Sequence, residues 1–295
     1  MPVHDELGIR MKTYYEQIPK TKLMRRTPVA IRLDGKAFHT FTRGFEKPFD
    51  EVLGNAMRET MKYLCENIQG CVFGYTQSDE ITLILVDYRK LNSDAWFDYE
   101  VQKMCSISAS MATMAFNKFF RFEVEAHYDM NTKDTEFDEI WLNDDAQVLN
   151  TVYWNAIDNG AMFDARCFNI PKEEVANLIY WRQLDASRNS IQMVGQAYFS
   201  HSELQNKSNS DIVNMLMEKH QISWLDDYPT HLRRGSCCIK KSLNECVRVV
   251  STEKWGESKS FLGVRKYGWV IDLEIPIFKG KDREYIERYI YFEEE

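Results

Sequence analysis

Apolar and polar positions alternate along the first part of the chain in a pattern that predicts strands and helices in a definite order. The compact apolar run at 28–34 (PVAIRLD) predicts a buried strand. Residues 50–66 place apolar side chains on one side at helical spacing, and Asp50 stands where an N-cap is expected. Two further strands are predicted at 71–75 and 81–86, joined by a short polar turn.

The pattern continues with a long helix and a further strand. Residues 98–120 predict a helix whose centre is rich in small residues, which suits close packing on a sheet. The acidic segment 134–145 lacks clear periodicity and is predicted to be an exposed connection. A fourth strand is predicted at 162–170, ended by Pro171, and a helix at 173–183.

The order strand, helix, strand, strand, helix, strand predicts an α+β chain of the ferredoxin-like kind, with an antiparallel sheet and helices on one face. In that topology the first and third strands are antiparallel neighbours. The end of the first strand is therefore expected beside the start of the third. After about residue 200 the pattern weakens to a helix at 211–220 and short β-like runs such as 246–250 and 268–271.

Composition narrows the class of protein without naming a function. The chain has 295 residues, 44% of them apolar and 28% charged, as in an ordinary soluble globular protein. It contains no apolar run of about 18 residues, and its start lacks the features of a signal peptide. Seven irregularly spaced cysteines predict reduced thiols and a cytoplasmic location. The sequence lacks CxxC and HxxxH pairs, which argues against structural zinc.

The formal net charge of −8 argues against a generic nucleic-acid coat, which would be basic overall. Two local basic clusters still allow an RNA-binding face, although a solvated surface is the alternative for each. The clusters are Lys12, Lys20, Lys22, Arg25 and Arg26, and Arg233, Arg234, Lys240 and Lys241.

Two carboxylates stand where predicted strands meet turns. Asp34 ends the first strand, and Asp79 lies in the turn before the third. As neighbours they can share Mg²⁺ and carry out phosphoryl chemistry. Gly35 would let its backbone carbonyl approach an ion without a Cβ in the way. The alternatives are that Asp34-Gly35 is an ordinary turn pair and Glu80 a solvated hairpin residue.

A group of cations accompanies the first strand and the loop after it, namely Arg32, Lys36, His39 and Lys47. Such a loop beside a metal pair suits triphosphate binding, with a solvated loop as the alternative. The sequence has no GxxxxGK[ST], GxGxxG or GxSxG pattern, which argues against P-loop, dinucleotide-binding and α/β-hydrolase chemistry.

Five motifs occur in order along the chain: RLDGKAFH at 32–39, KPFD at 47–50, YTQSDE at 75–80, FDAR at 163–166 and WRQLD at 181–185. Together they resemble the tRNA-His guanylyltransferase family over about residues 5–200. The resemblance implies a polymerase-type palm that adds nucleotides, usually from GTP, in the 3′-to-5′ direction to a tRNA 5′ end. The end is first activated with ATP or GTP.

Carried over by matching position, the resemblance also implies roles for individual residues. Asp34, the Gly35 carbonyl and Asp79 would hold two Mg²⁺ ions, with Glu80 supporting them as a catalytic residue. The residues implied to bind the triphosphates or the tRNA end are Arg32, Lys36, Ala37, Phe38, His39, Lys47, Asp50 and Ser78.

The sequence departs from the eukaryotic members after the WRQLD motif. Their HINN element is replaced by Ser187-Arg188-Asn189-Ser190, which resembles the RNS variant of bacterial and archaeal Thg-like proteins. That branch is implied to repair truncated tRNA 5′ ends. The resemblance further implies a homotetramer, with a palm-type catalytic domain at 1–200. The region 201–295 would then bind tRNA or support oligomerisation.

Two other functions remain compatible with the residues. A palm-type nucleotidyl cyclase or cyclic-dinucleotide synthase would use the same metals, although the chain has Gln77-Ser78-Asp79-Glu80 where a GGDEF-like hairpin would stand. A non-enzymatic RNA-binding protein is allowed by the basic clusters and the 13% aromatic content.

Overall fold

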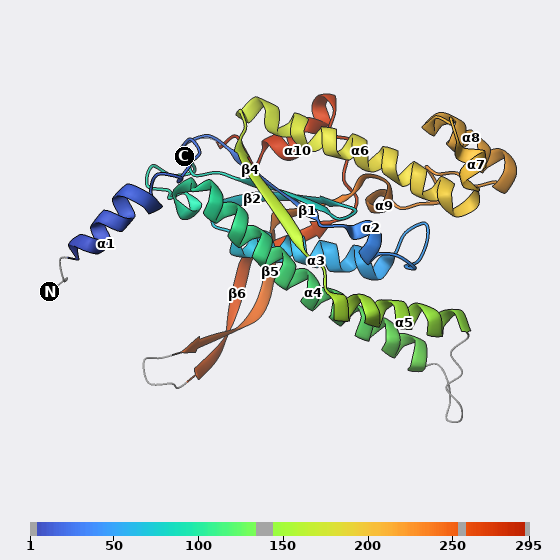
Figure 1. Cartoon of the computed structure of the whole chain (residues 1–295), viewed down its shortest axis with the longest axis horizontal. Coiled ribbons are helices and arrows are strands. Elements are labelled where there is room, and N and C mark those ends of the chain that lie inside the picture. The colour runs from blue at the N-terminus through green and yellow to red at the C-terminus, as the bar shows by residue number, and fades with distance from the viewer. Residues whose placement is uncertain (1–4, 134–143, 253–257, 293–295) are drawn as a thin grey trace.

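One antiparallel sheet organises the computed structural model, which describes residues 5–133, 144–252 and 258–292 (Figure 1). Within these ranges its strand order is β4-β1-β3-β2-β5-β6. The first four strands in this order have the ferredoxin-like arrangement, so the predicted fold is confirmed. The strands are β1 (Val29–Gly35), β2 (Cys71–Gln77), β3 (Glu80–Leu85), β4 (Phe163–Asn169), β5 (Ser236–Thr252) and β6 (Ser258–Asp272).

Helices cover both faces of the sheet. The predicted pair, α3 (Glu51–Asn67) and α4 (Val101–Lys133), packs on one face, and α6 (Lys172–Tyr198) lies across the other (Figure 1). The remaining helical segments are α1 (Glu6–Met11), η1 (Lys12–Glu16), α2 (Phe38–Phe41), η2 (Trp96–Tyr99), α5 (Asp144–Asn159), α7 (His201–Leu204), α8 (Asn209–His220), α9 (Thr230–Arg234), η3 (Gly280–Arg283) and α10 (Glu284–Glu287). In the described part of the chain, no helix is long and apolar enough to cross a membrane.

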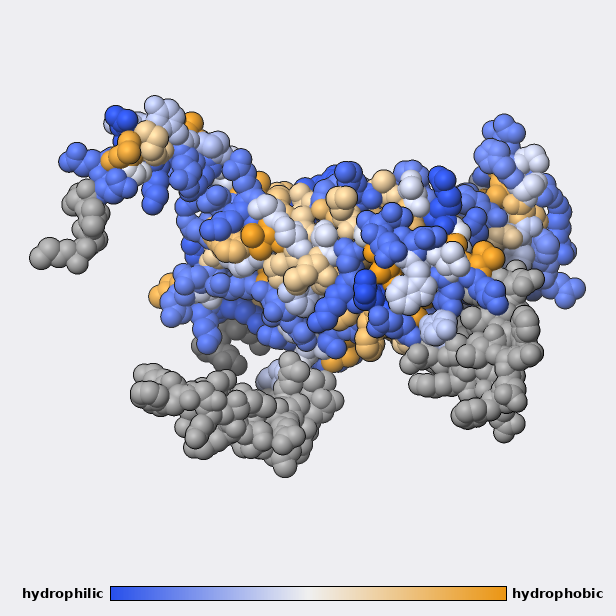
Figure 2. All heavy atoms as spheres, turned by 60° about the horizontal axis from the view of Figure 1, so that its bottom comes forward, coloured by the Kyte–Doolittle hydropathy of each residue, from blue (hydrophilic) through white to orange (hydrophobic). Residues whose placement is uncertain are grey.

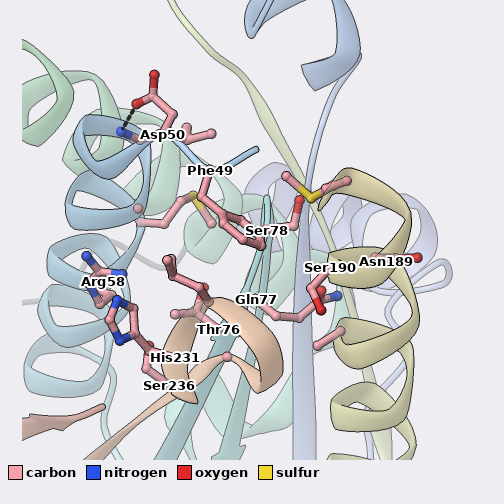
Figure 3. A pocket seen from close by; sticks show the side chains of 17 residues that line it. Phe49, Asp50, Arg58, Thr76, Gln77, Ser78, Asn189, Ser190, His231 and Ser236 are labelled. Carbon is pink, nitrogen blue, oxygen red and sulfur yellow. Dashed lines mark hydrogen bonds between the residues drawn. The ribbon is translucent and has the colours of Figure 1, made fainter. Parts of the chain in front are cut away.

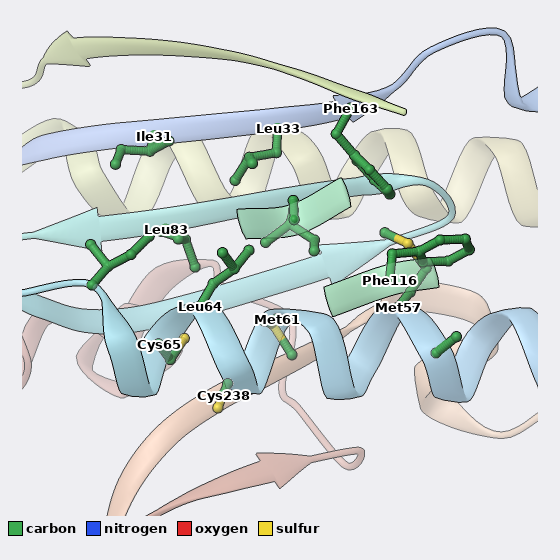
Figure 4. Packing of buried hydrophobic residues seen from close by; sticks show 14 of the residues in the cluster. Ile31, Leu33, Met57, Met61, Leu64, Cys65, Leu83, Phe116, Phe163 and Cys238 are labelled. Atoms are coloured by element: carbon green, nitrogen blue, oxygen red, sulfur yellow. The ribbon is translucent and has the colours of Figure 1, made fainter. Parts of the chain in front are cut away.

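The alternation of side chains along each strand builds two cores. Ile31 and Leu33 of β1 point to the α3–α4 side, where they pack with Met61 and Leu64 of α3 (Figure 4). Ala30 belongs instead to the core beneath α6. Because both faces of β1, β2 and β3 are largely buried, their sequences read as nearly continuous apolar runs, which is why these strands could be recognised.

The predicted elements are present, but several are longer than predicted. The helix predicted at 98–120 begins at Val101 and continues to Lys133, and the one predicted at 173–183 continues to Tyr198. Helix α5 was not predicted. It begins at the end of the acidic segment, whose residues 134–143 lie outside the described ranges.

The C-terminal part joins the same sheet through β5. Thr76 of β2 pairs with Ser236 of β5, and the Tyr75 hydroxyl donates a hydrogen bond of 2.6 Å to the Arg234 carbonyl. A Cβ on Gly235 would lie 2.5 Å from the Thr76 carbonyl oxygen. Strand β5 therefore supports the outer side of the β2–β3 hairpin. The division at residue 200 remains a prediction.

Replacing Gly235 by alanine should lower the free energy of unfolding by roughly 2–4 kcal/mol, because its backbone (φ 80°, ψ −174°) suits glycine and the added methyl meets β2. Urea unfolding measures the change. Gly280→Ala is the matched control: Gly280 also has a positive φ, of 62°, but no atom lies within 4 Å of an added Cβ. Its expected loss is only about 1 kcal/mol. Equal losses would contradict the packing argument.

Candidate active site

The end of β1 and the tip of the β2–β3 hairpin bring the two predicted carboxylates together. Asp34 lies opposite Glu80 in the register of β1 and β3. The Gly35 N–H donates a hydrogen bond of 3.1 Å to the Asp79 carbonyl, which continues this pairing beyond the strand. The predicted meeting of the first strand's end with the third strand's start is thus confirmed.

The hairpin turn holds Asp79 in an unfavourable electrostatic position. Ser78 adopts a left-handed conformation (φ 50°), and its hydroxyl donates a 3.0 Å hydrogen bond to Asp79 Oδ1. Burial raises the pKa of Asp79, and the negative charge of Asp34 adds to the rise against the opposing bond from Ser78. A bound cation would relieve both effects.

A cluster of aromatic rings fixes the loop that follows β1. Phe38 lies with its ring centroid 5.5 Å from that of Phe116 and 5.2 Å from that of Phe163. A Cβ on Gly35 would come within 2.2 Å of the Phe38 ring. Glycine is therefore required here by the buried ring, a reason that differs from the predicted access of its carbonyl. Ala37 turns the chain with a φ of 55°.

A cavity of about 510 Å³ opens beside the two carboxylates. Nine of the predicted site residues line it: Asp34, Gly35, Ala37, Phe38, His39, Lys47, Asp50, Ser78 and Asp79. Sequence reasoning missed the other lining residues, Thr42, Phe45, Glu46, Pro48, Leu53, Met193 and Gln196. Met193 and Gln196 come from the part of α6 beyond its predicted end, so no sequence pattern pointed to them.

Three predicted residues lie outside this cavity. Lys36 lines a neighbouring cavity of about 500 Å³ on the other side of Ala37. The Arg32 guanidinium lies 5.7 Å from the centroid of the Trp181 ring of α6. Glu80 Oε1 accepts a hydrogen bond of 2.6 Å from Arg182 Nε in α6.

The Glu80–Arg182 ion pair links the hairpin to α6. Both side chains are largely buried, and the Arg182 Nη2 donates a second hydrogen bond of 2.8 Å to Asp185. Burial raises the pKa of Glu80, which the charge of Arg182 opposes. In this arrangement the Glu80 side chain lies on the face of the sheet that α6 covers, and its ion pair with Arg182 helps to orient the hairpin.

Asp50 has a structural partner for each carboxylate oxygen. Oδ1 accepts the Leu53 N–H at 2.8 Å, which confirms the predicted cap of α3. Oδ2 accepts the Glu46 N–H at 3.1 Å and the Tyr153 hydroxyl at 2.7 Å. The carboxylate thus fastens the 46–50 loop to α3 and α5. Three of the roughly four acceptor positions of the carboxylate are thus occupied within the protein, one of them through the bond drawn at Asp50 in Figure 3.

Several cations of the two basic clusters already have partners within the chain. Lys22 pairs with Asp98, and Arg25 pairs with the buried Asp87 at 2.7 Å. Arg233 is itself buried, and its Nε donates to the Tyr228 carbonyl at 2.6 Å. These positive charges stabilise the fold, which weakens the argument from the clusters to an RNA-binding face.

The donor set at the carboxylate cavity fits Mg²⁺. Across the described ranges, no three His, Cys, Asp or Glu side chains gather as a candidate metal site. Asp34 and Asp79 line the cavity together with the backbone of Gly35, and Glu46 and Asp50 are further carboxylates of its wall. Mg²⁺ prefers oxygen ligands and usually binds one or two carboxylates together with substrate phosphates and water, so such a sparse set is sufficient.

Comparisons with known proteins show what this chain is similar to. The sequence model of a family described as tRNAHis guanylyltransferase matches residues 9–171. A solved bacterial tRNA(His) guanylyltransferase (Thg1)-like protein in complex with ATP is 38% identical, with a TM-score of 0.73, over 97% of this chain and 100% of that one. One in complex with GTP is 36% identical, with a TM-score of 0.69, over 98% and 100%. Uncharacterized protein R259 of Acanthamoeba polyphaga mimivirus is 28% identical, over 82% of this chain and 79% of its own.

Asp79→Asn should raise the melting temperature at neutral pH when no divalent cation is present. Because folding raises the pKa of Asp79, its ionisation weakens the folded state. This destabilisation is complete when the pH lies above the pKa of Asp79 in the folded protein. It disappears as the pH falls from that pKa to the ordinary pKa of an aspartate. The advantage of the variant should therefore shrink on acidification, as measured by thermal unfolding across pH.

Mg²⁺ should then stabilise the wild type and the control Asp158→Asn, whose side chain is exposed on α5, but not Asp79→Asn. Equal stabilisation of all three proteins would remove Asp79 from the metal site.

Proposed function

Because the chain belongs to the tRNAHis guanylyltransferase family of nucleotidyltransferases, we propose that it adds nucleotides, mainly from GTP, to the 5′ end of tRNA in the 3′-to-5′ direction. The observation that carries this proposal is the meeting of Asp34 and Asp79 at the wall of one cavity. Activation of the 5′ end by ATP or GTP is supported by the bacterial relatives, whose structures are in complex with these nucleotides.

We assign different roles in phosphoryl transfer to the residues around the cavity. Asp34, Asp79 and the Gly35 carbonyl would hold two Mg²⁺ ions. When bound, these ions neutralise phosphate charge and lower the pKa of the attacking 3′-hydroxyl. His39 and Lys47 are exposed on the cavity wall and have no carboxylate partner in the described part of the chain. We assign them to the phosphates of the nucleotide or of the RNA end.

We further propose repair of truncated tRNA 5′ ends as the physiological role. Ser187 stands where the eukaryotic HINN element has histidine, and its hydroxyl is bonded to the Gln183 carbonyl of its own helix at 3.1 Å. A contact that depends on that histidine is thus missing here. The identities of 38% and 36% to bacterial Thg1-like proteins support assignment to the same branch.

Association into a homotetramer is part of this proposal. Helix α1 and the following η1 bury none of their residues, and Leu7, Ile9 and Tyr14 are 60%, 52% and 62% exposed. Figure 2 shows apolar surface on this projecting segment. A helix this short is not stable alone in water, so contact with another copy would stabilise it. A cytoplasmic location is supported by the free thiols of the described cysteines.

Wild-type protein with Mg²⁺, ATP and GTP should restore 5′ nucleotides on a panel of tRNAs that lack one, with tRNA-His among them. Asp34→Ala and Asp79→Ala should each lower the rate at least about 10²–10³-fold, since each removes stabilisation of transition-state charge. Gel analysis of the labelled 5′ end measures addition. Asp158→Ala is the control and should stay active.

If no tRNA of the panel gains a nucleotide, the result contradicts the proposal. Cyclic or dinucleotide products formed from nucleoside triphosphates without RNA would favour the cyclase alternative.

Light scattering should give the mass of four chains for the wild type. Removal of residues 5–18 should lower that mass, because the exposed apolar side chains of α1 and η1 would no longer join copies. A monomeric wild type would contradict the tetramer.

A further inference from the structure

Two cysteine side chains meet where α4 packs on β4, outside the carboxylate cavity. Cys105 lies in α4 and Cys167 in β4, and the Cys105 thiol donates a weak hydrogen bond to the Cys167 sulfur, with the two Sγ atoms 3.5 Å apart. A disulfide bond is about 2.0 Å long, so the two sulfur atoms need to approach by only about 1.5 Å to form one. Neither thiol has a part in the proposed nucleotidyl transfer.

The meeting of the two thiols follows from the packing of α4 on β4. The Phe163 N–H donates a hydrogen bond of 3.1 Å to Thr113 Oγ1, which joins the two elements eight residues further along the helix. Residues 105–113 of a helix rise by about 12 Å, and residues 163–167 of a strand span about 13 Å. Because α4 and β4 run in opposite directions over nearly equal lengths, the bond at Thr113 places Cys105 opposite Cys167.

Both thiols are accessible from solvent without unfolding of the sheet. Strand β4 lies at one end of the strand order within the described ranges, and Cys105 and Cys167 are both partly exposed. The other cysteines with described surroundings are buried in the cores. These are Cys65, Cys71, Cys237 and Cys238. A small oxidant therefore reaches the pair at β4 before it reaches the core thiols.

The surroundings of the two sulfur atoms differ and set an order of reaction. Burial raises the pKa of the Cys167 thiol to about 12, and the contact with Cys105 adds to the rise. The Cys167 thiol also faces the Val101 carbonyl at 3.8 Å. Since the thiolate is the form that attacks an oxidant, the first reaction falls to Cys105, and Cys167 stays available as a thiol beside it.

We propose that Cys105 and Cys167 form a reversible oxidation site that takes a hydroperoxide as its substrate and closes to a disulfide between α4 and β4. The Cys105 thiolate attacks one peroxide oxygen, the O–O bond breaks, and the other oxygen takes up a proton and leaves as water or an alcohol. The Cys167 sulfur then attacks the Cys105 sulfenic acid. The S–S bond forms, the S–O bond breaks, and water leaves with the Cys167 proton, so the peroxide gains the two electrons that the thiols lose.

This inference goes beyond the proposed function and does not rest on it. In a reducing compartment the pair stays a dithiol, and the disulfide forms only when an oxidant is present. The disulfide would join residues 62 positions apart, so it would restrict the unfolded chain and stabilise the fold. It would also spare Cys105 from oxidation to a sulfinic acid, which ordinary thiols do not reverse.

Hydrogen peroxide should link the tryptic peptides 104–118 and 167–172 of the folded full chain, each of which contains one cysteine, and a reducing agent should separate them. Mass spectrometry identifies the products. The oxidised wild type should melt about 5–10 °C above the reduced protein. Cys167→Ser should instead accumulate sulfinic acid at Cys105, and Cys105→Ser should leave Cys167 reduced. Cys71→Ala, which removes a buried thiol, is the matched control and should still form the link.

Three results would overturn the inference. One is the absence of linked peptides from the folded wild type, another is a link that forms only in denaturant, and the third is the same Cys105 product in Cys167→Ser as in the wild type. Thermal unfolding of each untreated variant shows that it is folded, and the peptides of the wild type need no variant at all. Because these measurements involve neither nucleotide nor tRNA, their failure would leave the proposed function standing.

Discussion

Repulsion between two partly exposed carboxylates held close together is the constraint on which the site depends. Asp34 and Asp79 approach each other because the Gly35 N–H is bonded to the Asp79 carbonyl, and the hairpin strands β2 and β3 that carry Asp79 are fully buried. Neither carboxylate can move away without breaking that pairing, since the apolar cores on both faces of the sheet fix the register. The fold thus holds together two charges that would separate in water, and this is the physical reason for our proposal that divalent cations bind here.

Helix α6 completes the site from the side opposite to α3 and α4. It is attached to the hairpin by the Glu80–Arg182 ion pair, and Trp181 lies against the guanidinium groups of both Arg32 and Arg182. A buried ion pair adds little net stability but is strongly destabilising when one partner is lost. Its main effect here is to fix how α6 crosses the sheet, and so where Met193 reaches the carboxylate cavity.

The sequence allowed the palm-like core and the meeting of its carboxylates to be predicted, because buried strands leave unmistakable apolar runs and fixed topology sets their neighbours. The cap at Asp50 was also recognisable from its local pattern. The partner of Glu80 and the pairing of Arg25 with Asp87 were not, since ion pairs between distant segments leave no periodic signal. The full length of α6 was missed because its second half lacks a clear apolar stripe, so the part of the cavity wall that Met193 and Gln196 supply could not be anticipated.

The bond between the Tyr75 hydroxyl and the Arg234 carbonyl joins residues 159 positions apart. During translation, the outer edge of β2 must therefore wait for β5 to leave the ribosome before it is covered. A chain that stops short of residue 230 would expose that edge to other nascent chains and would lack both α9 and the strand beside the hairpin. The residues that line the carboxylate cavity are therefore all synthesised before the strand that covers the outer edge of their hairpin.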